Sequence, residues 1–207
     1  MKTPNIHLGK LNKENIDSIK KIWAESLPDN LKNIIGYQFI ELYLEKFFKD
    51  NLNLGLGIYD SKNILGFVLF GNDSKIIKEI IKQKFFKILY SFLLYVIKMK
   101  INYMLKYIDV IVYLFASKKK ERTLLSENAE LLIMAVRKES QNNGYGSFLL
   151  SETFKNNKKY FSKFNYIYVK TLKNSPENIF FYQKNGFKLF YEIFGRVYLK
   201  YKVKKNY

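Results

Sequence analysis

A short loop with two glycines, residues 141–147 (Gln-Asn-Asn-Gly-Tyr-Gly-Ser), joins an apolar run to a stretch with helical periodicity. Glycines let a backbone approach a ligand closely, and the first amide groups of a helix, together with its dipole, favour a phosphate group. The loop has no Gly-Lys-Ser/Thr ending of a Walker loop, and Leu149 stands at the third glycine position of the dinucleotide fingerprint. The loop therefore predicts a different kind of phosphate-binding turn, with an ordinary glycine-rich helix start as the alternative.

Two further patterns accompany this loop. The apolar run 129–136 (Ala-Glu-Leu-Leu-Ile-Met-Ala-Val) predicts a buried strand before it, and residues 181–187 (Phe-Tyr-Gln-Lys-Asn-Gly-Phe) follow after one intervening strand. In this order and spacing, with Gln141-x-x-Gly144-x-Gly146 between them, the patterns resemble the GNAT superfamily of acetyl-CoA-dependent N-acetyltransferases. The resemblance covers residues 129–202 well, whereas residues 1–71 fit by the order of their elements.

The resemblance implies acetyl-CoA as the co-substrate, bound without a metal ion. The loop would hold the pyrophosphate, and the backbone of the strand before it would pair with the pantetheine arm like an added strand. Where the family often has an asparagine that contacts this arm, the chain has Ser175, so a neighbouring asparagine would substitute. The implied cofactor-binding residues are Met134, Ala135, Val136, Gln141, Asn142, Asn143, Gly144, Tyr145, Gly146, Ser147, Asn174 and Asn178.

The resemblance also implies two catalytic residues. Glu130 matches a glutamate that removes a proton from the attacking amine in some members, and a carboxylate among apolar residues suits a base working near pH 7. The alternatives are a water chain as the base, and a strand-end glutamate that faces solvent or pairs with a lysine. Tyr182 matches the tyrosine that protonates the leaving thiolate, with a core aromatic residue as its alternative.

Composition excludes several other kinds of site. The chain has 207 residues, no cysteine and one histidine, His7, which leaves no disulfide scaffold, thiolate zinc site or three-histidine metal site. The formal net charge of +18 favours an anionic partner. Because only Arg122, Arg137 and Arg196 are arginines, this charge fits diffuse attraction better than sequence-specific nucleic-acid binding.

The elements that must position the site follow from the apolar periodicity. Strands are predicted at residues 6–8, 52–59, 64–70, 129–136, 166–170, 187–194 and 197–203, and helices at 15–25, 31–49, 144–157 and 175–184. This order is an α/β pattern, and the resemblance implies a mixed, mostly antiparallel central sheet flanked by helices. We expect one domain over residues 1–207, with a helical insertion at about residues 75–116 between a hairpin and the central strand.

Three roles are open for the insertion: extra helices that cover the fold or a homodimer interface, a lid over the acceptor pocket, or a basic amphipathic helix on an anionic membrane. The acceptor is expected to be a primary amine of a small molecule, an amino sugar or a peptide. Loops 26–33 and 194–197 would bound it, with Glu25, Asp29 and Glu192 holding a cationic amine.

A second function remains open, in which a non-catalytic domain of this fold binds an anionic membrane surface or nucleic acid. Residues 1–10 have no apolar run of signal-peptide length, and the uncharged run 88–97 is shorter than a membrane span. We therefore expect a cytoplasmic protein.

Overall fold

A seven-stranded sheet runs through the computed structural model of the protein, which describes residues 6–26, 34–61, 63–80, 82, 128–193 and 195–204. The order across the sheet is β1-β2-β3-β4-β5-β7-β6. All neighbouring strands are antiparallel except the central pair β4 and β5, which is parallel. The strands are β1 (Ile6–Lys10), β2 (Leu54–Asp60), β3 (Asn63–Gly71), β4 (Ala129–Val136), β5 (Tyr166–Leu172), β6 (Lys188–Ile193) and β7 (Arg196–Lys202).

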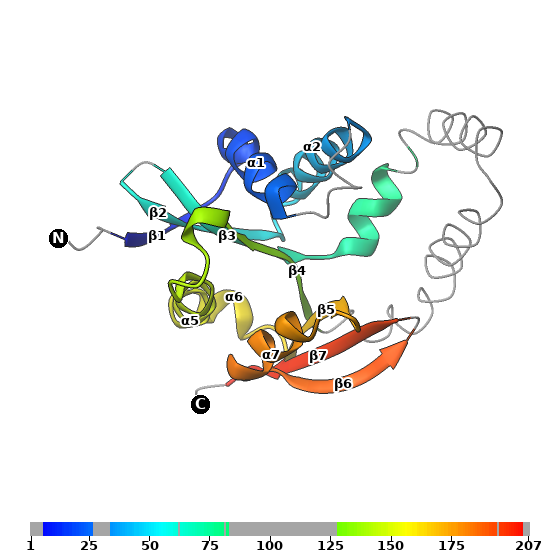
Figure 1. Ribbon diagram of the computed structural model, residues 1–207. Coiled ribbons are helices and arrows are strands. Elements are labelled where there is room, and N and C mark those ends of the chain that lie inside the picture. The colour runs from blue at the N-terminus through cyan, green and yellow to red at the C-terminus, as the bar shows by residue number, and fades with distance from the viewer. Residues whose placement is uncertain are drawn as a thin grey trace.

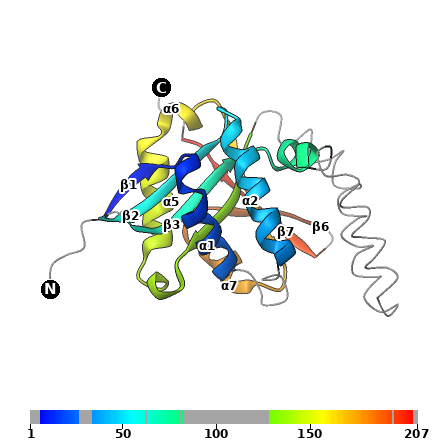
Figure 2. The ribbon, with the colours of Figure 1, turned by 90° about the horizontal axis from the view of Figure 1, so that it is seen from above.

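Helices cover both faces of this sheet (Figure 1). On one face lie α1 (Ile16–Ser26) and α2 (Ile34–Lys49), side by side across β2 and β3 (Figure 2). On the other face lie α5 (Tyr145–Asn156), the short α6 (Lys158–Phe161) and α7 (Pro176–Lys184). Residues 73–80 form a further helical segment directly after β3, and single 3₁₀ turns occur at Lys13–Asn15 and Lys138–Ser140.

The sheet separates two apolar cores, because successive side chains of a strand point to opposite faces. Along β3, Val68 and Phe70 pack with α5 and α6, whereas Phe67 and Leu69 pack with α1 and α2. Ile76 joins the second core from the helical segment 73–80. A strand that is buried on both faces reads as a continuous apolar run, as residues 64–70 do in the sequence.

The parallel pair β4 and β5 is short relative to its strands. Ala129, Glu130 and Leu131 of β4 pair with residues 167–169 of β5, and no further pair joins the two fully described strands. β4 nevertheless continues to Val136 and β5 to Leu172, each held by its other neighbour, β3 and β7 respectively. The sheet therefore opens between β4 and β5 on the side where α5 begins.

The predicted fold class is confirmed: the sheet is mixed, mostly antiparallel and flanked by helices. All seven predicted strands are present, and the strand predicted at residues 129–136 has those bounds. The four predicted helices are present within a few residues, with residues 31–33 of the second one outside the described residues. The short α6 was not predicted. Most of the helical insertion expected at residues 75–116 also lies outside the described residues, apart from 75–80, which are helical, and Lys82.

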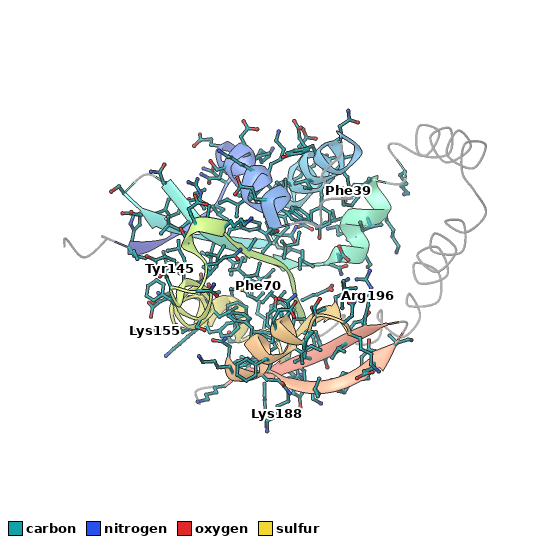
Figure 3. The ribbon with its side chains drawn as sticks, viewed as in Figure 1. Phe39, Phe70, Tyr145, Lys155, Lys188 and Arg196 are labelled. Atoms are coloured by element: carbon teal, nitrogen blue, oxygen red, sulfur yellow. The ribbon has the colours of Figure 1, made fainter. Side chains whose placement is uncertain are left out.

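Replacing Phe70 with alanine tests the core that supports α5. This ring has no exposed surface and lies edge-on to Phe161, with ring centroids 5.0 Å apart (Figure 3). We expect the free energy of unfolding to fall by about 3–5 kcal/mol, because a large cavity is created. Urea denaturation measures it. Leu52→Ala, at a side chain that is 72% exposed, is the control and should change it by less than about 0.5 kcal/mol. A loss below about 1 kcal/mol for Phe70→Ala would contradict this packing.

Candidate active site

The loop between β4 and α5 is held by its own side chains. The Gln141 side-chain amide donates to the Val136 carbonyl at 3.0 Å, and the Asn143 amide donates to the Gln141 carbonyl at 3.2 Å. Asn142 and Gly144 have positive φ angles of 62° and 78°. Side-chain amides of the loop thus hydrogen-bond to the backbone carbonyls of Val136 and Gln141, and the chain turns sharply into α5.

The N-terminus of α5 carries no side-chain cap. Its N-cap residue is Gly144, which makes no side-chain hydrogen bond to the first turn. The first amide groups of a helix have no intrahelical acceptor, so they are available to an anion. Of the predicted phosphate-binding residues 142 to 147, the last three, Tyr145, Gly146 and Ser147, supply these amides. The Gln141 side chain points back to β4 and positions the loop.

Gly146 allows the first turn of α5 to approach both β4 and α7. A Cβ atom at this position would lie 3.0 Å from Phe181 Cε2 and 3.3 Å from Met134 Cε. The three predicted sequence patterns therefore meet at one point: Met134 comes from the strand, Gly146 from the loop and Phe181 from the aromatic pair. The three patterns accompany one another in the sequence because their residues contact one another in the structure.

The β4 residues expected to pair with a pantetheine arm lie where the sheet is open. Met134, Ala135 and Val136 pair with β3 on one side, and no β5 residue pairs with them on the other. The Val136 carbonyl accepts the Gln141 amide. An extended ligand segment beside this strand would add to the sheet at the gap that β5 leaves.

Glu130 is buried and paired with a lysine. It is 4% exposed, and its Oε1 lies 2.9 Å from Nζ of Lys170 on β5. The same Nζ lies 2.6 Å from Oδ2 of Asp73, and the Tyr43 hydroxyl donates to Oδ1 of Asp73 at 2.9 Å. These four residues, called the carboxylate–lysine cluster below, come from α2, the helical segment 73–80, β4 and β5. The solvent-facing alternative for Glu130 is wrong, and pairing with a lysine is observed.

The charges of the cluster shift two pKa values. Burial acts to raise the pKa of Asp73, but the charge and hydrogen bond of Lys170 and the hydrogen bond of Tyr43 outweigh it, so this pKa lies below its ordinary value. Arg196, which lies at the start of β7 (Figure 3), also lowers the pKa of Asp73 through its charge. Burial, and then the charge of Asp73, raise the pKa of Tyr43 well above its ordinary value. Asp73 is therefore a carboxylate and Tyr43 a neutral phenol at neutral pH.

Tyr182 lies on α7 against the core beneath α5. Its ring centroid is 5.3 Å from that of Phe181 and 5.5 Å from that of Phe187, with rings steeply inclined. Burial raises the pKa of Tyr182 above its ordinary value of 10.0. The hydroxyl thus stays protonated over the whole neutral range. The same packing makes Tyr182 part of the apolar core, which agrees with the alternative of a core aromatic residue.

The remaining predicted site residues come from α1, the start of α7 and β6. Asn174 and Asn178 are exposed at the start of α7. Glu25 is exposed near the end of α1, and Asp29 lies outside the described residues. Glu192 on β6 pairs with Lys173, with Oε2 and Nζ 2.7 Å apart, so this carboxylate already has a cationic partner.

Sequence reasoning missed Asp73, Lys170 and Tyr43. Asp73 and Lys170 are 97 positions apart in the chain, and only the sheet brings them together. One signal was available: Lys170 interrupts the apolar strand 166–170, and it lies one position beyond the last residue of β5 that pairs with β4. A lysine there needs a carboxylate nearby, since buried charges are almost always paired.

The part of the chain that the structure describes contains neither a cluster of metal-ligating side chains nor a helix that could span a membrane. Among these residues, histidine and acidic side chains form no group of three that would suit a metal ion. Among the same residues, no helix combines the length and apolarity of a membrane span.

The comparison with known proteins supports the motifs. The model of the acetyltransferase (GNAT) domain matches residues 107–189, which include the glycine loop and Tyr182. No curated protein sequence matches the chain.

Solved structures match nearly the whole chain at low identity. PaiA N-acetyltransferase from Thermoplasma acidophilum, in complex with coenzyme A, is 18% identical over 96% of this chain and 99% of that one, with a TM-score of 0.56. A GNAT-family acetyltransferase from Staphylococcus aureus is 13% identical over 96% and 99%, with a TM-score of 0.58. The ribosomal-protein-S18-alanine N-acetyltransferase from Escherichia coli is 9% identical over 97% and 96%, with a TM-score of 0.57. These structures show that the chain has the fold of GNAT acetyltransferases, and the domain model over residues 107–189 confirms the resemblance to the GNAT superfamily.

Replacing Asp73 with asparagine tests the cluster through pH. The folded pKa of Asp73 lies below its ordinary value of 3.8, so between the two values the unfolded chain binds more protons. The ionised form therefore stabilises the fold above that value, and the contribution is lost as pH falls through the folded pKa. We expect the stability difference between wild type and Asp73→Asn to be largest near neutral pH and to shrink below about pH 4.

Urea denaturation from about pH 7 to about pH 2.5 measures this difference. Asp17→Asn, at a carboxylate that is 91% exposed, is the control for removing a surface charge and should have little effect throughout. A difference for Asp73→Asn that does not depend on pH would contradict the ion pair.

Proposed function

We propose that this chain, which has the GNAT fold and a matching GNAT domain, transfers the acetyl group of acetyl-CoA to a primary amine. The observation that carries the proposal is the opening between β4 and β5. It lies beside the uncapped start of α5, and the buried Glu130 stands where the two strands part. Amides that would bind phosphate, a strand edge unpaired with β5 and a carboxylate thus occur together where β4 and β5 part.

The donor would be held by backbone more than by side chains. The first amides of α5 would take the pyrophosphate, and the edge of β4 at Met134 and Ala135 would pair with the pantetheine arm. When bound, acetyl-CoA supplies the thioester carbonyl that the amine attacks. The structure of PaiA N-acetyltransferase from Thermoplasma acidophilum, which has the same fold, is a complex with coenzyme A.

Glu130 would take the proton from the attacking amine. The carboxylate–lysine cluster places Glu130 and Asp73 on the same lysine ammonium, and the carboxylate of Glu130 would stabilise the positive charge that develops on the amine nitrogen. The N–C bond forms, the proton passes to Glu130 directly or through a water chain, and Glu130 returns it to solvent. Tyr43 and Asp73 act on this step through Lys170, as positioning residues.

Tyr182 would stabilise the leaving thiolate as the C–S bond breaks. Because burial raises its pKa, the phenol is a weaker acid than the thiol that it would protonate. A hydrogen bond from the hydroxyl to the thiolate is therefore favoured over complete proton transfer. We infer that Tyr182 acts mainly as a hydrogen-bond donor, with the thiolate taking its proton from solvent after release.

Turnover tests the proposal directly. A panel of small amines, amino sugars and peptide amines, incubated with acetyl-CoA and assayed for free thiol, should contain an accepted substrate. Glu130→Gln and Tyr182→Phe should each lower kcat by about 10²-fold or more with little change in the KM for acetyl-CoA. Because Tyr182 stays protonated, it should impose no alkaline loss of kcat below about pH 10.

Thermal unfolding separates loss of chemistry from loss of fold in these variants. Undiminished turnover in Tyr182→Phe would remove Tyr182 from the mechanism. If acetyl-CoA causes no thermal shift while anionic vesicles or DNA do, the non-catalytic reading of the basic domain holds instead.

Gly146→Val tests the donor site without requiring the acceptor. The new side chain would meet Phe181 and Met134, and overpacking of about 1–3 kcal/mol would displace the first turn of α5. We expect the Kd for coenzyme A to rise by about 10-fold to 100-fold in calorimetry. Ser151→Val, farther along the same helix and exposed, is the control for a branched residue in α5 and should leave Kd unchanged. Equal affinity of the two variants would contradict the proposed phosphate turn.

A further inference from the structure

A cavity of about 790 Å³ lies at the C-terminal end of α5, away from the opening in the sheet. It is bounded by the second half of α5, by α6, by the start of β5, by the end of α7 and by the end of β7. Its lining residues are Leu150, Ser151, Phe154, Lys155, Lys158, Lys159, Phe161, Ser162, Ile167, Asn185, Tyr201, Val203 and Lys204. The volume is within the range of small-molecule sites in proteins.

The floor of the cavity is apolar and rigid. The rings of Phe154 and Tyr201 stack with centroids 4.7 Å apart, and Phe161 lies edge-on to Phe154 at 5.3 Å. Leu150 and Ile167 close the bottom and belong to the core that underlies α5. A tail of apolar groups placed here would be removed from water against side chains that are already fixed by packing.

The rim of the cavity is cationic. Four lysines line it, Lys155, Lys158, Lys159 and Lys204, and the lining includes no aspartate or glutamate. Lys155 has one carboxylate nearby, Glu152, at 3.6 Å, and its side chain is 72% exposed (Figure 3). Among the described residues, the other three lysines form no ion pair. A negative head group at the mouth would therefore meet several lysines with little competition from acids.

The cavity is separate from the proposed donor site. α5 has twelve residues, so its two ends are about 17 Å apart. The uncapped amides are at the N-terminal end, whereas the lining residues of α5 begin at Leu150, beyond its first turn, and extend to Lys155 in its last turn. None of the predicted cofactor-binding or catalytic residues lines the cavity.

We propose that this cavity binds a single-chain lipid anion, with its alkyl chain on the Phe154–Tyr201 floor and its carboxylate or phosphate head at the lysines. Both halves of the site are then used. A free inorganic anion would leave the apolar floor in water, and an amine or a neutral lipid would leave the lysines without a partner. The proposal does not depend on acetyl transfer.

A fluorescent fatty acid tests the site in the full-length protein. 11-(Dansylamino)undecanoate should bind saturably with increased emission, as its dansyl group leaves water. Dodecanoate and a lysophosphatidate should displace it, which identifies the shared chemistry of one chain and one anionic head. Inorganic phosphate and dodecyltrimethylammonium should not displace it, and saturating coenzyme A should leave its Kd unchanged.

Two variants locate the binding. Lys158→Ala combined with Lys159→Ala should raise the Kd of the probe at least about fivefold, since two head-group charges are lost. Lys21→Ala combined with Lys188→Ala, at exposed lysines outside the cavity, removes the same charge and should change Kd less than about twofold. Val203→Trp should weaken binding of the probe at least about fivefold by placing an indole in the space that the alkyl chain would occupy, with thermal unfolding to verify that the variant folds.

Three results would overturn the proposal. One is displacement of the probe by coenzyme A, which would place it in the donor site. Another is an equal effect of the two lysine pairs, which would reduce the interaction to net charge. The third is binding to phosphatidylglycerol vesicles with no displacement of the probe by dodecanoate, which would make this face a membrane contact.

Discussion

The single parallel strand pair, β4 and β5, is the constraint on which the site depends. The two strands pair through three residues of β4 and then part, although both continue and are held firmly by their outer neighbours. Backbone amide and carbonyl groups inside a protein must find partners. Beyond Leu131 the edge of β4 has no pairing with β5, and an extended ligand segment would complement it, as the proposed function requires. The chain leads from this edge through a tight loop into α5, so the strand edge and the uncapped helix start are fixed together by a connection of eight residues, 137–144.

The carboxylate–lysine cluster stabilises the place where the strands part. A buried carboxylate on β4 is costly without a counterion, and Lys170 supplies it from β5. The lysine in turn contacts Asp73, which reaches the gap from the segment after β3. Charges from three elements thus compensate one another across the opening, and Tyr43 connects them to α2. Removing Lys170 would leave both carboxylates without this cation, so the ion pairs of the cluster help to hold the opening in shape.

Sequence reasoning located the strands, the helices and the glycine loop because each leaves a local pattern. The run 129–136 is apolar except for Glu130. The backbone at residue 144 has a positive φ angle, which a glycine adopts without strain. Burial of Glu130 could also be anticipated from its neighbours. Its partner could not, because Lys170 and Asp73 reach it only through the order of strands in the sheet. The α5–α6 junction was missed because four residues of helix are too few for a periodic signal.

The excess of basic residues is informative about function only where acidic side chains are absent nearby. With 36 basic and 18 acidic residues, at least half of the basic groups lack a carboxylate of their own, so an unpaired lysine is the ordinary case in this chain. On an exposed helix, Lys158 and Lys159 alone would not indicate a binding site. They differ from the others because an aromatic floor lies directly beside them, and an ion that is only charged gains nothing from such a floor. The combination favours a ligand that has both a negative charge and an alkyl chain. This cavity lies toward the C-terminal end of α5, whereas the N-terminal end of α5 faces the opening in the sheet.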